Sequence, residues 1–180
     1  MPKDPFRFYS SKMKTKDLVN RFACESSNTH TARQDDESIE ILYCYSKGDI
    51  GTSTGYAGGI CGSDAGYNGG NVFIYHCYNI GDNIYDNSGG ICGSNTGDSG
   101  TVEIYNCYST GEIGVDAGGI CGSNSGTVDI YNCYTIGGIS DDGAGGICAQ
   151  TDDANVIIHN CITRVSSNGI DGNNIESSVG

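Results

Sequence analysis

Cysteine is the residue type in this chain with the widest chemistry, because thiolates bind metals, form disulfides and act as nucleophiles. The 180 residues include ten cysteines, and all but Cys24 fall into two series. The first series is Cys44, Cys77, Cys107, Cys133 and Cys161. The second series is Cys61, Cys92, Cys121 and Cys148.

Neither series has the spacing of a metal or redox site. A zinc site needs four converging nitrogen or sulfur ligands, commonly beginning with C-x2-C, which does not occur in the sequence. Stacked strands bring Cα atoms near disulfide range but hold Cβ atoms too far apart for a relaxed bridge. Buried free cysteine packs as a small apolar residue. We therefore interpret both series as core positions and predict no metal and no cofactor.

Acidic residues are the other group that could do chemistry, on carbohydrates. A glycosidase needs two carboxylates at a controlled separation, and a lyase needs clustered carboxylates with a base. The acidic doublets of the repeats are Asp141-Asp142 and Asp152-Asp153, and the basic residues there, Lys47 and Arg164, lie at opposite ends. We interpret these carboxylates as solvated surface groups and assign no catalytic residue. A polysaccharide lyase or hydrolase remains the alternative function.

Tyrosines form the third candidate group. They recur beside the first cysteine series, where strand alternation directs them outward. A stripe of exposed tyrosine suits contact with a protein or a sugar ring. The alternative is cross-strand stacking that only stabilises the sheet. The candidate contact surface comprises Tyr75, Tyr105, Tyr131, Tyr78, Tyr108 and Tyr134.

All these residues are positioned by an internal repeat. Two half-motifs alternate, exemplified by TVEIYNCYSTGEIG at 101–114 and AGGICGSNSG at 117–126, and equivalent cysteines recur every 26 to 33 residues. The segments alternate with period two, are short, and are bounded by glycine, which indicates strands. Each unit of about 29 residues offers three short strands, too few to bury an apolar face alone. The sequence therefore predicts an all-β fold: a short parallel β-helix of four to five coils. We expect right-handed winding, which the repeat pattern does not itself determine.

In such a fold, equivalent residues of successive coils form columns. Two interior columns should come from the valine and isoleucine of the first half-motif, and a third from the isoleucine of the second. Asn106, Asn132 and Asn160 should mark a corner where stacked amides hydrogen-bond. Paired glycines such as Gly118-Gly119 should supply positive φ or close backbone approach. The predicted interior columns are Val72, Val102, Val128 and Val156; Ile41, Ile74, Ile104, Ile130 and Ile158; and Ile60, Ile91, Ile120 and Ile147.

Charge divides the chain into a head (1–37), a repeat body (38–165) and a polar tail (166–180). Seven of the nine basic residues lie in the first 33 positions, whereas the chain from residue 38 onward carries a net charge of −14. So acidic a body repels phosphates, which excludes nucleic acid and anionic membranes as partners of the repeats. Residues 10–25 fit a short amphipathic helix that would cap the first coil; a flexible head is the other reading.

The N-terminus shows no apolar signal-peptide core, and no stretch is long enough to span a membrane. These features predict an intracellular or particle-associated protein, a virion included, with its cysteines as thiols. Solenoid ends expose strand edges, so end-to-end self-association is one expected mode of assembly.

Residues 118–126 (GGICGSNSG) followed by 128–137 (VDIYNCYTIG) resemble the GLUG-type repeat, roughly G-G-[LI]-x-G-x-N-x-G-x-[IV]-x-N-[CS]-Y-x-x-G. The resemblance covers residues 38–165 and implies a β-helical stalk of the kind found in bacterial surface and adhesin-like proteins. The chain departs from that family in carrying cysteine in both half-motifs. It also resembles uncharacterised cysteine-containing repeat proteins of large DNA viruses of amoebae. Neither family supplies catalytic residues, so we expect a non-enzymatic structural or interaction module.

Overall fold

The computed structural model describes residues 38–51, 56–66, 69–123, 126–139, 143–149 and 155–163. The head, the whole of the tail and both acidic doublets of the repeats lie outside this part of the chain, and with them the predicted capping helix. Twelve strands make up the regular structure of the described residues. They are β1 (Ser38–Leu42), β2 (Tyr45–Ser46), β3 (Asn71–Tyr75), β4 (Tyr78–Asn79), β5 (Asn83–Ile84), β6 (Thr101–Tyr105), β7 (Tyr108–Ser109), β8 (Glu112–Ile113), β9 (Thr127–Tyr131), β10 (Tyr134–Thr135), β11 (Asn155–His159) and β12 (Ile162–Thr163).

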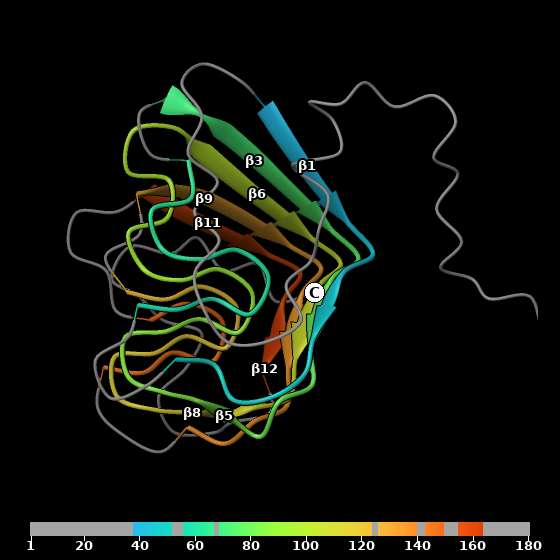
Figure 1. Ribbon diagram of the computed structural model, residues 1–180, viewed down its shortest axis with the longest axis vertical. Coiled ribbons are helices and arrows are strands. Elements are labelled where there is room, and N and C mark those ends of the chain that lie inside the picture. The colour runs from blue at the N-terminus through green and yellow to red at the C-terminus, as the bar shows by residue number, and fades with distance from the viewer. Residues whose placement is uncertain are drawn as a thin grey trace, which may run out of the picture.

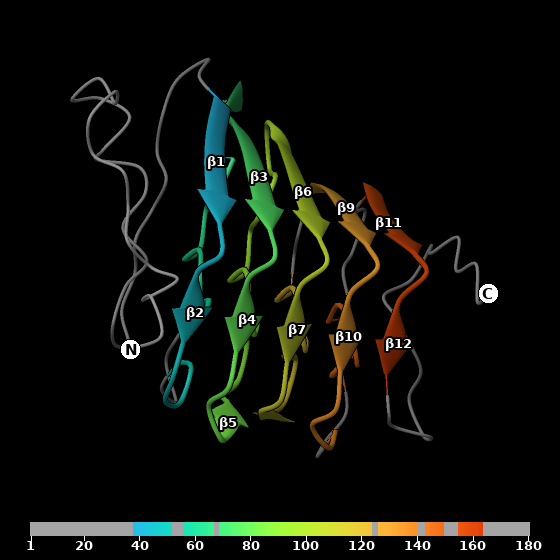
Figure 2. The ribbon, with the colours of Figure 1, turned by 90° about the vertical axis from the view of Figure 1, so that its right-hand side faces the viewer.

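These strands wind into the predicted parallel β-solenoid. The first sheet has the order β1-β3-β6-β9-β11, the second has β2-β4-β7-β10-β12, and β5 pairs with β8 in a third. All pairings are parallel, and each coil adds one strand to each of the two large sheets (Figure 2). The N-terminal coils lie nearest the viewer in Figure 1, and the chain runs clockwise as it recedes, so the solenoid is right-handed.

The register places the predicted columns inside the solenoid. Val102 pairs with Val128 and Ile104 with Ile130, and all four side chains are fully buried. The Ile60 column and both cysteine series join them in one apolar core. A smaller core cluster gathers at the far end of each coil around Ile113. The prediction of stacked equivalent residues is therefore confirmed for the described coils.

The segment V-x-I-Y-N-C-Y forms two strands, and the predicted corner at the asparagine separates them. The corner residue adopts a left-handed backbone, with φ of 54° at Asn106 and 52° at Asn132. Asparagine tolerates this conformation better than most residues, which explains its recurrence there. The backbone N–H of Asn106 donates to the Tyr131 carbonyl at 3.0 Å, and its side chain is exposed. Hydrogen bonding between the stacked amides stays a prediction.

The paired glycines of the second half-motif serve close backbone approach. A Cβ at Gly118 would overlap the carbonyl oxygen of Cys121 and lie 2.7 Å from the backbone nitrogen of Ala149 in the next coil. The paired glycines have negative or extended φ values, so of the two predicted roles only close approach applies.

A buried polar column runs parallel to the cysteines and was not predicted. Asn79 is fully buried on β4. Its Oδ1 accepts from Ser46 Oγ at 3.1 Å, and its Nδ2 donates to Ser109 Oγ at 3.2 Å. The column continues to Thr135, whose Oγ1 donates to the Gly146 carbonyl at 2.7 Å. Each buried polar group thus has a partner, which offsets its desolvation.

Candidate interaction surface and the buried thiol columns

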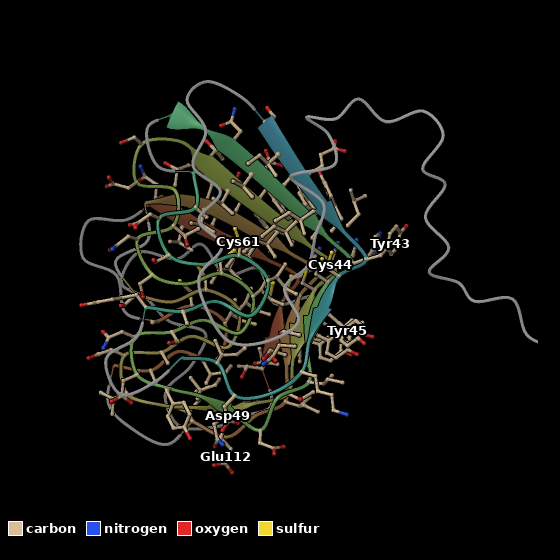
Figure 3. The ribbon with its side chains drawn as sticks, in the orientation of Figure 1. Tyr43, Cys44, Tyr45, Asp49, Cys61 and Glu112 are labelled. Carbon is tan, nitrogen blue, oxygen red and sulfur yellow. The ribbon has the colours of Figure 1, made fainter. Side chains whose placement is uncertain are left out.

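The first cysteine series forms a hydrogen-bonded column just inside the corner (Figure 3). The backbone N–H of Cys77 donates to Cys107 Sγ at 3.4 Å, and that of Cys107 donates to Cys133 Sγ at 3.4 Å. Each thiol in turn donates to the carbonyl two residues earlier, as Cys107 Sγ does to Tyr105 at 3.3 Å. The left-handed corner residue causes this arrangement, because it turns two consecutive N–H groups toward the same neighbouring coil. A carbonyl accepts the first and the thiol accepts the second.

These thiols all pack in the apolar core, but they differ in acidity: hydrogen bonds with Cys133 and Cys77 lower the pKa of Cys107, in the first series. All nine cysteines of the described residues are in the thiol form and buried. In the second series, hydrogen bonding to the Cys61 thiol together with complete burial raises the pKa of Cys92 well above its ordinary value. Hydrogen bonding to Cys121, again with burial, does the same for the pKa of Cys148. The thiols of Cys92 and Cys148 therefore stay protonated, which makes these two poor nucleophiles and poor metal ligands. Within the described residues no three His, Cys, Asp or Glu side chains are grouped to hold a metal. Because all nine cysteines are buried in one apolar core, their interpretation as core positions is confirmed.

The predicted tyrosines form two aromatic ladders, one on each side of the corner. The first ladder, on the β1 sheet, consists of Tyr75, Tyr105, Tyr131 and His159. The second, on the β2 sheet, consists of Tyr45, Tyr78, Tyr108 and Tyr134. Within the ladders the ring centroids are 4.7 to 5.4 Å apart and the planes lie within 18° of parallel. Tyr43 and Tyr45 point outward where the first coil turns between the two sheets (Figure 3).

This stacking limits what the tyrosines can bind. Every ring inside a ladder has its faces covered by the rings above and below, so a sugar cannot stack on those faces. The inner tyrosines are half-buried, so part of each outer edge remains at the surface, and the terminal Tyr45 and Tyr134 are 41% and 42% exposed. Neighbouring hydroxyls follow the strand spacing of about 4.8 Å. The ladders therefore offer two rows of hydrogen-bonding groups on a convex ridge.

A pair of carboxyl groups lies beside the first ladder. Glu103 on β6 and Asp129 on β9 are directly paired in register and share the outer face of the sheet. Tyr105 donates its hydroxyl to Glu103 Oε2 at 2.9 Å. Asp129 Oδ1 is buried and has no hydrogen-bond partner among the described residues. Burial raises the pKa of Asp129, and the nearby Glu103 carboxylate adds to the increase. Like charges on adjacent strands repel, so the pair favours a bound proton.

The raised pKa of Asp129 predicts that the protein loses stability as the pH rises. The unfolded carboxyl has a pKa of about 3.9, and the folded one binds its proton more tightly. The free energy of unfolding contributed by this group is therefore largest at acid pH and falls as the pH increases through the folded pKa. Asp129→Asn cannot lose a proton, so we expect it to flatten this decline and to match or exceed the wild type at pH 7.

Urea unfolding midpoints measured between pH 4 and pH 8 check this expectation. Glu103→Gln removes the repelling charge and should flatten the same decline in part. Wild-type and Asp129→Asn midpoints that run parallel over the whole range would contradict the assignment.

The structure therefore brings together the tyrosines of the candidate surface and the two carboxyls that flank them. The sequence presents Glu103 and Asp129 as isolated acidic residues. Their pairing could have been found from the repeat alignment, since both occupy the position after the buried valine. The acidic doublets considered for catalysis lie outside the described residues.

Comparison with family models, with curated proteins and with solved structures gives no match for this chain. The described residues define the class of protein as a right-handed parallel β-solenoid with interior thiol columns and exterior tyrosine ladders. In the described part of the chain no helix is long and apolar enough to cross a membrane.

Proposed function

We propose that this protein is a non-enzymatic structural and interaction module that binds a partner protein through its two tyrosine ladders. The observation that carries the proposal is the continuous stacking of tyrosines on both sides of one corner. Stacking fixes the rings in the free protein, so binding orders few side chains and loses little entropy. Tyrosine hydroxyls held in rows are the type of group that protein interfaces use at their contacts.

Covered ring faces favour a protein over a glycan as the partner. Sugars commonly bind tyrosine through stacking, which the ladders leave to their end rings alone, whereas hydroxyl edges suit hydrogen bonds to a polypeptide. The acidic charge of the chain restricts the class of partner further. The chain from residue 38 onward carries a net charge of −14, and Glu40, Glu103 and Asp129 share one face with the first ladder. The partner should therefore be basic, and its association should weaken with salt.

A hydroxyl-deletion variant tests the proposal without disturbing the fold. Replacing Tyr78, Tyr108 and Tyr134 together by Phe keeps the stacked rings and removes the second row of hydroxyls. Peptides selected from a random display library against the wild type should be rich in Lys and Arg. They should bind the triple variant about tenfold more weakly, which corresponds to about 1.4 kcal/mol.

The triple variant must retain the wild-type circular-dichroism spectrum for the comparison to count. Selected peptides that bind both proteins equally would contradict the role of the ladders. A glycan array run in parallel provides the other outcome: a glycan that binds the wild type but not the triple variant would replace the protein partner.

A carbohydrate-active enzyme is the second candidate, and the Glu103–Asp129 pair is the observation that favours it. Adjacent in-register strands are about 4.8 Å apart, close to the carboxyl separation of about 5–5.5 Å in retaining glycosidases. The raised pKa of Asp129 suits an acid beside an ionised partner. An activity screen on acidic polysaccharides decides the matter. Cleavage that disappears in Asp129→Asn would establish the enzyme and displace the non-enzymatic proposal.

A further inference from the structure

Tyr105 on β6 differs from the other tyrosines in the partner of its hydroxyl group. The phenolic O–H donates to Glu103 Oε2, on the same strand, at 2.9 Å. That distance lies within the usual range of an O–H···O hydrogen bond. Tyr85 also approaches a carboxylate, but its hydroxyl lies 3.4 Å from Asp49 Oδ2 and the contact is exposed. Among the tyrosines that the structure describes, Tyr105 alone combines a short contact with a half-buried carboxylate.

The ring of Tyr105 is also enclosed by its neighbours in the first ladder. Its centroid lies 5.2 Å from that of Tyr75 and 4.7 Å from that of Tyr131. Because β6 is the middle strand of the first sheet, both faces of the ring are covered (Figure 2). Aromatic faces carry negative potential and attract positive charge. The two neighbouring rings therefore stabilise the ring of Tyr105 when it loses an electron.

Tyr105 keeps its phenolic proton until an electron is removed. Burial raises the pKa of Tyr105 above its ordinary value, and the hydrogen bond to Glu103 and the charge of that carboxylate add to the increase. The easily oxidised phenolate is therefore not formed at neutral pH. A phenol that loses an electron becomes a strong acid, so its proton must pass to a base that is already within hydrogen-bond reach. The Glu103 carboxylate is that base.

The second ladder provides the same stacking without such a base. Tyr108 lies between Tyr78 and Tyr134, with centroid distances of 4.9 Å on both sides. The five strands of that sheet, as the structure describes them, contain no acidic residue. Burial, with the neighbouring tyrosines, raises the pKa of Tyr108 as well. The two central tyrosines therefore differ chiefly in whether a carboxylate accepts the hydroxyl proton.

We propose that Tyr105 is a site of one-electron oxidation, with Glu103 as the acceptor of its phenolic proton. The co-reactant is an outer-sphere one-electron oxidant of the class of high-potential metal complexes. One electron passes from Tyr105 to the oxidant, which is reduced. The O–H bond of Tyr105 breaks and a new O–H bond forms at Glu103 Oε2, which leaves a neutral tyrosyl radical beside a protonated carboxyl group. This reaction is independent of partner binding by the ladders.

Flash-generated tris(bipyridine)ruthenium(III) is the probe oxidant for the test, and transient absorption of the tyrosyl radical is the readout. In the full chain at neutral pH we expect a fast phase from Tyr105 and slower phases from the other tyrosines. Tyr105→Phe should remove the fast phase, whereas Tyr108→Phe should leave it unchanged. Glu103→Gln keeps the shape of the side chain but cannot accept a proton. It should slow the fast phase about a hundredfold, the lower end of what a positioned base contributes.

Glu40→Gln is the matched control for charge. Glu40 is exposed on the outer face of the same sheet, in the same column as Glu103. Its replacement removes the same charge near the cationic oxidant, but should leave the rate of the fast phase nearly unchanged. A fast phase that survives Glu103→Gln or Tyr105→Phe would overturn the proposal. Equal slowing by Glu40→Gln would also overturn it, because the carboxylates would then act only by attracting the oxidant.

Discussion

Gly118→Ala should prevent this protein from folding stably. The added Cβ would overlap the carbonyl oxygen of Cys121 and lie 2.7 Å from the backbone nitrogen of Ala149. Both obstacles are backbone atoms, one in the same coil and one in the next, so no side chain can rotate away. Relief requires the coils to separate, which breaks hydrogen bonds such as the one from Gly118 N–H to the Ser88 carbonyl at 2.9 Å. We expect a loss of at least about 3 kcal/mol, the upper end of overpacking costs.

Gly138→Ala is the matched control for that substitution. A Cβ at Gly138 would meet no atom within 4 Å. The same chemical change should therefore alter the unfolding free energy by less than about 0.5 kcal/mol. Urea unfolding of the three proteins, followed by circular dichroism, provides the comparison. Similar midpoints for Gly118→Ala and the wild type would show that the coils do not approach as closely as described.

Ile104→Ala should have the second largest effect. Ile104 lies on the central strand β6, is fully buried, and pairs with Ile74 on one side and Ile130 on the other. Removing its side chain leaves a cavity between coils that are hydrogen-bonded on both sides and cannot collapse. The expected cost is about 2–5 kcal/mol. Each coil contacts only its neighbours, so the lost contacts should uncouple the coils before β6 from the coils after it. The remaining contacts within each part of the core should be little affected.

Ile157→Ala serves as the control for the cavity. Ile157 lies on β11 in the same sheet, but its side chain faces outward and is 39% exposed. Its truncation removes little buried area and should cost less than about 1 kcal/mol. Amide hydrogen exchange adds a second readout, since Ile104→Ala should increase exchange in β3, β6 and β9 most strongly. Equal destabilisation by the two substitutions would contradict the stacking of isoleucines as the main source of stability.

The interior columns could be predicted from sequence because a solenoid makes its long-range contacts between equivalent positions. Aligning one repeat with the next therefore identifies neighbours in space, as it does for Val102 and Val128. Period-two alternation then separates inward from outward side chains along each strand. The same alignment of repeats predicted that the cysteines are buried in columns and that the tyrosines can stack.

The polar column was missed because alternation changes phase at the corner. Tyr75 and His76 both face outward, since the left-handed backbone at His76, with φ of 55°, turns the chain between them and Cys77. After that turn Cys77 and Asn79 face inward. A polar residue in an alternating pattern is normally placed at the surface, so Asn79 gave no signal of burial.

The sequence by itself therefore determined the class of fold, the register of the coils and the residues of both thiol columns. Only the tertiary structure decided which polar side chains the predicted corner directs inward, and how Asp129 is buried beside Glu103. The physical reason is that the two kinds of information depend on different interactions. Repeats encode which residues are neighbours, but the direction of each side chain past the corner depends on a single backbone dihedral. Asparagine favours that dihedral at three corners, but Tyr43 and His76 adopt it as well, so there the coils above and below hold it.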